Sequence, residues 1–113
     1  MYERLKSKKL AYVLIGYYLR HQITDIQLDI KMTKEKTVIS IHGRTPEKID
    51  GIDELCEQTF KTRRVEFEDY YDELLGVRDS DSELEIMGYL VDEAYSSYQD
   101  GVLTFTIVRV IKD

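Results

Sequence analysis

The sequence predicts a single domain with an α/β (α+β) two-layer sandwich, in which a small sheet, mostly antiparallel or mixed, carries helices on one face. Three observations support this prediction. The chain has 113 residues, which is enough for one core and too few for two. Residues 25–43 have the pattern of two strands joined by a polar turn, and residues 102–111 have that of a third strand. Most of the remainder has helical spacing, which gives the order α-β-β-α-α-α-β over residues 1–113.

The predicted helix over residues 3–20 is apolar almost all the way round its axis. Its apolar positions include Leu10, Ala11, Tyr12, Val13, Leu14, Ile15, Tyr17 and Tyr18. Such a helix is either central in its domain or covered on its second side by another chain. The first alternative makes it a core helix whose tyrosine hydroxyls reach water. The second makes Tyr12, Ile15 and Tyr18 a candidate dimer interface, because tyrosine is enriched where one end of a side chain is buried and the other is wet.

The predicted hairpin begins with residues 25–32, which alternate polar and apolar without a break. A polar turn at residues 33–36 leads into a second strand at residues 37–43, which is rich in β-branched side chains. The alternation puts four apolar side chains of the first strand on one face that we expect to be buried: Ile26, Leu28, Ile30 and Met32. The hairpin is thus expected to form the floor on which the helices lie.

Three further helices are predicted, over residues 45–60, 65–75 and 82–97. Thr45 and Pro46 are typical of an N-cap and of a first helical position. Ser82 has a glutamate three residues later, which is the pattern of a capping box. A turn at residues 99–101 is predicted to lead into the last strand.

The charge is distributed unevenly along the chain. The formal net charge is −6, which argues against nucleic acid as a partner. Residues 1–44 carry nine basic and four acidic residues, whereas residues 45–113 carry seven basic and eighteen acidic residues. Either the two parts neutralise each other across the fold, or a basic patch meets an acidic partner or a symmetry mate. The residues of that patch would be Arg4, Lys6, Lys8 and Lys9.

The single cysteine, Cys56, excludes an intrachain disulfide, which fits a reducing compartment. The apolar run at residues 10–19 follows basic residues, but it contains Gly16 and three tyrosines, and no small-residue cleavage site follows it. It therefore does not have the pattern of a signal peptide. The run is also about half as long as a membrane-spanning helix needs to be. We therefore expect a cytoplasmic protein without a membrane partner.

Several stretches match one known family in order: a helix at residues 14–21 that ends in His, the hairpin at residues 25–43, and a helical stretch at residues 84–95. Residues 101–107 then follow the pattern G-x-L-x-F-x-I. In these features the chain resembles the GHKL family, the ATP-binding fold of histidine kinases, gyrase and Hsp90-type chaperones. The resemblance implies an α/β sandwich of the kind predicted above.

The residues that bind nucleotide in the GHKL family differ in this chain. Tyr17 stands where the family has an asparagine that binds magnesium. Residues 42–45, His-Gly-Arg-Thr, stand where it has Asp-x-Gly-x-Gly, and residues 80–83, Ser-Asp-Ser-Glu, stand where it has a glycine-rich phosphate loop. The family also has a strand before its last one, which the pattern here does not predict. The resemblance therefore implies a degenerate relative with no nucleotide binding, and no site residue is carried over.

The residues themselves offer few candidates for catalysis or metal binding. His21, His42 and Cys56 could supply a nucleophile and a base, but Cys56 lies on an apolar helical stripe, where cysteine usually acts as a small hydrophobe. The spacing of histidine and cysteine does not match a zinc site, and no glycine-rich phosphate loop is present. We therefore expect no catalytic residue, no metal and no cofactor.

Tyrosine is in excess, with nine residues in a chain that has no tryptophan. The tyrosines either cap the edge of a small core or line an interface or a groove for a flat ligand. The leading hypothesis is a non-enzymatic interaction or regulatory domain that forms a homo-oligomer or binds an unidentified protein. The alternative is a small-molecule-binding or enzymatic domain with a pocket of tyrosine, histidine and acidic side chains, for which Tyr17, His42 and Tyr89 are the candidates.

Overall fold

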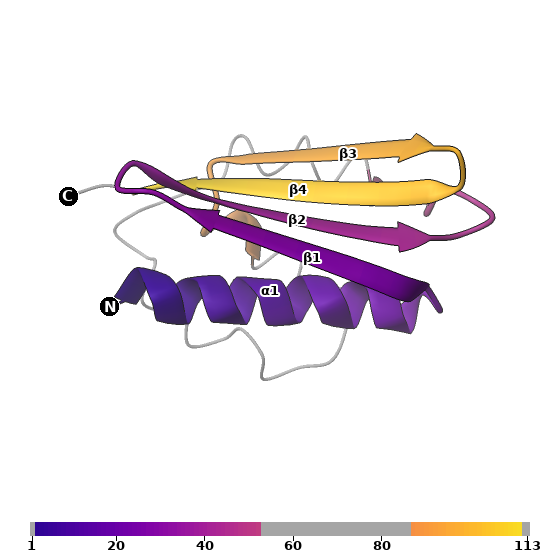
Figure 1. Ribbon diagram of the computed structural model, residues 1–113, viewed down its shortest axis with the longest axis horizontal. Coiled ribbons are helices and arrows are strands. Elements are labelled where there is room, and N and C mark those ends of the chain that lie inside the picture. Colours follow the sequence, from indigo (N-terminus) through magenta and orange to yellow (C-terminus); the bar gives the residue numbers. More distant parts are fainter. Residues whose placement is uncertain (1, 53–86, 112–113) are drawn as a thin grey trace.

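The computed structural model describes residues 2–52 and 87–111, which form one helix and a four-stranded antiparallel sheet, an α+β fold (Figure 1). The elements are α1 (Tyr2–Arg20), β1 (Thr24–Met32), β2 (Lys36–Arg44), β3 (Glu93–Gln99) and β4 (Val102–Val110). The order of strands in the sheet is β1-β2-β4-β3, so that the hairpins β1–β2 and β3–β4 meet through β2 and β4. The predicted helix at residues 65–75, the capping box at Ser82 and Cys56 lie outside the described residues.

The core lies between α1 and the central strands of the sheet. Odd-numbered residues 37–43 of β2 and 103–109 of β4 are buried on the face toward α1, while the opposite face is half-exposed apart from buried Val108. This alternation follows from the two-residue period of a strand. The core side chains are Leu10, Val13, Leu14, Tyr17, Tyr18, Ile23, Ile39, Ile41, Ile52, Met87, Leu90, Val91, Ala94, Leu103, Phe105 and Ile107.

The predicted helix at residues 3–20 is confirmed as α1, and it ends in a Schellman motif. The Ile23 N–H donates to the Tyr18 carbonyl at 3.0 Å, and the Gln22 N–H donates to the Leu19 carbonyl at 3.0 Å. Gln22 has a φ of 63°, the left-handed conformation that this motif requires and that glycine adopts most easily. No helix within residues 2–52 and 87–111 is both long and apolar enough to cross a membrane.

Gly43 allows the end of α1 to approach β2 closely. A Cβ atom at this position would overlap Ile23 Cγ2 and would lie 3.0 Å from Tyr18 Cδ2. The Tyr18 hydroxyl lies 2.9 Å from the Leu103 carbonyl and 3.2 Å from the Ile41 carbonyl, so its single proton can be donated to one of them at a time. Gly43 was expected to end the second strand, but β2 continues through Arg44. The glycine is therefore required for packing of the end of α1 against the sheet.

A buried ion pair joins the first turn of α1 to β4. Arg109 Nε lies 2.8 Å from Glu3 Oε2, and Arg109 Nη2 lies 2.9 Å from Glu3 Oε1, which is the bidentate geometry. Arg109 Nη1 donates to the Leu90 carbonyl at 2.7 Å. Because Arg109 is 2% exposed, its charge depends on these partners.

The predicted hairpin is confirmed as β1 and β2, which pair in register from Gln27–His42 to Met32–Thr37. The expectation that one face of β1 is buried holds in part. Ile26 and Leu28 pack against the core, whereas Ile30 and Met32 are 44% and 42% exposed. β1 is at the edge of the sheet, and Ile30 and Met32 at this end of it line an open groove together with the short side chains Ser7 and Ala11 of α1.

The predicted helix over residues 82–97 is wrong for its second half, because residues 93–99 form strand β3. Gln99 pairs with Val102 across a two-residue turn in which Asp100 and Gly101 have φ values of 53° and 77°. Two positive φ angles define the type I′ turn, whose twist matches an antiparallel hairpin. Pairing with β4 thus makes residues 93–99 a strand instead of a helix. Strand β3 therefore precedes the last strand, β4, although the sequence pattern did not predict it.

The predicted helix start at residues 45–51 is also wrong. These residues form bends and turns without helical structure, and Gly51 has a φ of 85°. The Thr45 hydroxyl donates to the Glu47 carbonyl at 3.0 Å, whereas an N-cap hydroxyl accepts a hydrogen bond from a backbone N–H. The Thr45 N–H donates to Gly101 O, so this segment continues the β2–β4 pairing for one more residue.

Candidate functional site

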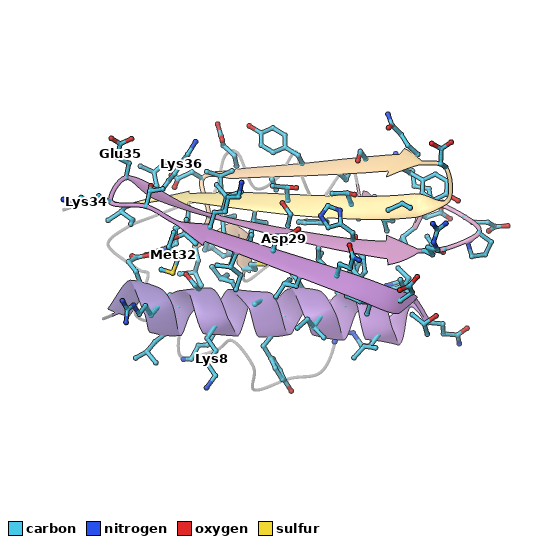
Figure 2. The ribbon with its side chains drawn as sticks, viewed as in Figure 1. Lys8, Asp29, Met32, Lys34, Glu35 and Lys36 are labelled. Carbon is cyan, nitrogen blue, oxygen red and sulfur yellow. The ribbon has the colours of Figure 1, made fainter. Side chains whose placement is uncertain are left out.

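A shallow groove of about 400 Å³ runs between α1 and the edge strand β1. Its surface is almost wholly apolar, and its lining is formed by Arg4, Ser7, Lys8, Ala11, Tyr12, Ile15, Ile30 and Met32. Ser7 and Ala11 have short side chains, so α1 leaves a hollow opposite the end of β1. Figure 2 shows Met32 pointing from β1 toward α1.

Large apolar side chains from two elements are exposed along this groove. Tyr12 is 62% exposed, more than Ile30 or Met32. Leu5 and Leu19, which are 54% and 58% exposed, lie seven residues before and after Tyr12, and this spacing puts the three on one line along the helix. Single exposed apolar residues are common, but a contiguous group marks an interaction site. We call Tyr12, Ile15, Ile30 and Met32 the α1–β1 surface, and Leu5 and Leu19 add exposed apolar side chains on the line of Tyr12 along α1.

Two of the three predicted interface residues belong to the α1–β1 surface. Tyr12 and Ile15 both line the groove. Tyr18 does not, because it is 0% exposed and its hydroxyl is held inside the core. Burial, with a smaller contribution from Tyr17, raises the pKa of Tyr18 above the ordinary tyrosine value. Tyr18 is therefore a structural residue, and its assignment to the interface was wrong.

The predicted basic patch is smaller in the structure than in the sequence. Arg4 and Lys8 are exposed and line the groove near the start of α1. Lys6 is buried and Lys9 is half-buried, and both have interaction partners. The charge that a binding partner would meet at this end of the groove therefore comes from Arg4 and Lys8.

The three predicted pocket residues are not brought together. Tyr17 is buried on the inner face, with its ring centroid 4.6 Å from that of His21. His42 is on the opposite face of the sheet, where it pairs with Thr104 of β4. Tyr89 comes next to Leu90, whose carbonyl binds Arg109 near the other end of β4. The pocket predicted from Tyr17, His42 and Tyr89 was therefore wrong.

His42 is instead the centre of a polar row across three strands. His42 Nδ1 lies 2.9 Å from Thr104 Oγ1, and His42 Nε2 lies 3.3 Å from Asp29 Oδ2. In the next row, Ser40 Oγ lies 3.0 Å from Thr106 Oγ1. The order carboxylate, imidazole, hydroxyl is that of an activated nucleophile. However, Asp29 is 70% exposed, and the surrounding main-chain N–H groups of β2 and β4 belong to the sheet ladder, where they cannot stabilise an oxyanion.

The sequence contained a signal for this row that the prediction did not use. Asp29 is on the polar side of the alternation in β1, and His42 and Thr104 are on the half-exposed sides of β2 and β4. Their contact depends on the order of the strands, which the sequence pattern did not supply. Within residues 2–52 and 87–111, no group of three or more His, Cys, Asp or Glu side chains is placed to hold a metal ion.

Comparisons with known proteins did not reveal a relative: no protein-family model matches the chain, and no curated protein matches it significantly. The α1–β1 surface and the polar row are therefore the features of the described residues that bear on function.

Proposed function

We propose that this chain is a non-enzymatic interaction domain that self-associates through the α1–β1 surface. The observation that carries the proposal is the apolar groove in which Tyr12, Ile15, Ile30 and Met32 converge from two elements. Contiguous exposed apolar surface of this kind marks an interaction site. A second copy is the occupant that brings the same exposed apolar side chains to the interface, so that both surfaces are covered at once.

The charges favour a two-fold arrangement in which the helices run antiparallel. Arg4 and Lys8 lie at the start of α1, so parallel helices would place four cations together. In an antiparallel arrangement these groups lie at opposite ends of the interface, and the helix dipoles oppose each other.

Light scattering coupled to size-exclusion chromatography tests self-association. The wild-type chain is expected to elute as a dimer at tens of micromolar concentration, and Tyr12→Lys is expected to elute as a monomer with an unchanged circular dichroism spectrum. Tyr95→Lys is the matched control, because Tyr95 is 48% exposed and lies on β3, at the opposite edge of the sheet. A wild-type monomer at high micromolar concentration contradicts the proposal.

We also propose that the domain is cytoplasmic and does not bind nucleotide, and that its sheet is the floor of a two-layer sandwich. The packing role of Gly43 supports the absence of nucleotide binding, because this glycine accommodates the side chains of Tyr18 and Ile23. A thermal shift with ATP and magnesium would contradict it.

A ligand-binding or enzymatic function is the second candidate, and the polar row of Asp29, His42 and Thr104 is the observation that favours it. A thermal shift assay with a panel of nucleotides and metabolites distinguishes the ligand-binding function from the interaction function. A stabilising ligand whose effect is lost in His42→Ala and kept in Tyr12→Lys would favour this second function.

A further inference from the structure

We propose, resting on the self-association inferred above, that two copies join by antiparallel pairing of their β1 strands about an axis at Ile30. The two four-stranded sheets would then form one continuous sheet with both α1 helices on the same face. Three features of β1 lead to this arrangement: its free backbone groups, the bulge that ends its regular part, and the order of its charges.

The free edge of β1 presents the backbone groups of Leu28, Ile30 and Met32. The Thr33 N–H donates to the Lys36 carbonyl at 2.9 Å, which makes Thr33 and Lys36 a hydrogen-bonded pair. Because such pairs alternate along an antiparallel ladder, the backbone groups of Lys31 and Asp29 also bond to β2. The backbone N–H and C=O groups of the residues between them point away from β2. In the described part of the chain, β1 pairs with β2 alone.

The neighbouring ladder confirms this alternation independently. The Thr45 N–H donates to Gly101 O at 2.9 Å, so Thr45 and every second residue before it in β2 bond to β4. Ile39 is one of them, and Ile39 is the residue opposite Ile30. Ile30 and Ile39 are therefore a non-hydrogen-bonded pair, which leaves the N–H and C=O of Ile30 at the free edge.

A bulge limits the free edge to residues 28–32. The pairing of β1 with β2 shifts between Thr24 and Gln27, and Asp25 has a φ of 57°. Bulges of this kind turn an edge away from a second strand. After Met32 the chain enters the hairpin turn, where Figure 2 shows Lys34 and Glu35 at the tip. A partner strand therefore has five residues of regular edge available.

The charges of β1 select one register on this edge. A two-fold axis perpendicular to the sheet at Ile30 places Asp29 opposite Lys31 of the second copy, and it does so twice. An axis at Asp29 would oppose two carboxylates, and an axis at Lys31 would oppose two ammonium groups. The charges of Asp29 and Lys31 thus disfavour the other two registers and allow pairing about an axis at Ile30.

The inner face agrees with this register. With the axis at Ile30, Leu28 lies opposite Met32 of the second copy, and Ile30 lies opposite Ile30 of the second copy. Pairing would therefore cover Ile30 and Met32, the side chains of β1 that are exposed although they face α1. The two grooves would become continuous across the axis, with Tyr12 and Ile15 at their walls.

Charge reversal tests the register by sedimentation equilibrium on the full chain. Lys31→Asp and Asp29→Lys each place like charges opposite each other at two positions, and each is expected to raise the dimer Kd about tenfold. The double variant Asp29→Lys/Lys31→Asp restores opposite charges and is expected to return Kd to within about threefold of wild type. Lys34→Asp makes the same charge change as Lys31→Asp outside the paired segment and is expected to leave Kd unchanged.

Amide hydrogen exchange of the wild-type chain gives a second test without any substitution. Raising the concentration through Kd is expected to slow exchange at Leu28, Ile30 and Met32, while Asp29 and Lys31 are slow throughout because they bond to β2. A dimer whose Kd is unaffected by both single reversals, and whose Leu28, Ile30 and Met32 amides stay fast, overturns edge pairing and leaves self-association standing. A monomeric wild type overturns both.

Discussion

Substitution of Gly43 by alanine is expected to destabilise the fold by about 2 kcal/mol. The new Cβ atom would overlap Ile23 Cγ2 and would lie 3.0 and 3.1 Å from Tyr18 Cδ2 and Cε2. Ile23 and Tyr18 are 1% and 0% exposed, so neither can move into solvent to make room. Overpacking of this kind costs about 1–3 kcal/mol. A displaced Tyr18 ring would also weaken its hydroxyl hydrogen bond, worth about 1 kcal/mol, and the better strand propensity of alanine offsets roughly 0.5–1 kcal/mol.

Urea denaturation followed by circular dichroism measures this change, and the thermal midpoint is expected to fall by about 10 °C. A double-mutant cycle with Ile23→Ala identifies the cause, because that substitution removes the Cγ2 atom that the alanine would strike. The double variant is expected to lose less stability than the sum of the single variants. A Gly43→Ala protein within about 0.5 kcal/mol of wild type, or an additive cycle, would refute the proposed steric role.

The remaining predictions concern single contacts in the described part of the chain. Tyr18→Phe is expected to reduce the loss of stability above about pH 10, because the raised pKa of buried Tyr18 makes ionisation of this side chain favour the unfolded state at high pH. Urea titrations at pH 8 and pH 11 measure this loss, and an equal loss in the wild-type and variant proteins would contradict the prediction. Thr37→Val is expected to stabilise the fold by about 1 kcal/mol in chemical denaturation, because the Thr37 hydroxyl is buried without a hydrogen-bond partner. Gln22→Gly is expected to raise the thermal midpoint by removing a side chain from the left-handed conformation, and a lower midpoint would count against the Schellman assignment. Glu3→Gln is expected to cost about 2–4 kcal/mol in urea denaturation, because it removes the negative charge from the bidentate pair with buried Arg109, and a neutral result would show that the pair contributes little.

The parts of the fold that were predicted correctly have a dense local signal. The alternation in residues 25–32 and the apolar helix at residues 3–20 each specify their conformation through neighbours along the chain. Strand β3 has no such signal, because Glu-Ala-Tyr-Ser-Ser-Tyr-Gln is poor in β-branched residues and its apolar positions also fit helical spacing. The Asp100-Gly101 dipeptide was the available signal, since it is typical of a type I′ hairpin turn.

The candidate site was predicted in part for a similar reason. The all-round apolar character of α1 indicated a second covered side, and Tyr12 and Ile15 do lie on an exposed surface. Whether Tyr18 faces the core or this surface depends on the rotation of α1 relative to the sheet, and Tyr18 lies on the buried side, close to Gly43. The exposure of Ile30 and Met32 depends on β1 being an edge strand, which is a property of the strand order.

The position of β4 has a consequence for synthesis of the protein. β4 is the last strand in the sequence, yet it lies between β2 and β3 in the sheet and carries Arg109, the partner of Glu3. While residues 102–110 are still inside the ribosome, β2 and β3 both lack β4, the strand that joins them in the described sheet, so this sheet can be completed only after translation of this segment. The long sequence separation of these contacts also predicts slow folding for a domain of this size. During that interval the β1–β2 hairpin lacks β4 on the β2 side and β1 is an edge strand on the other. This hairpin is therefore where a chaperone or a neighbouring nascent chain would bind.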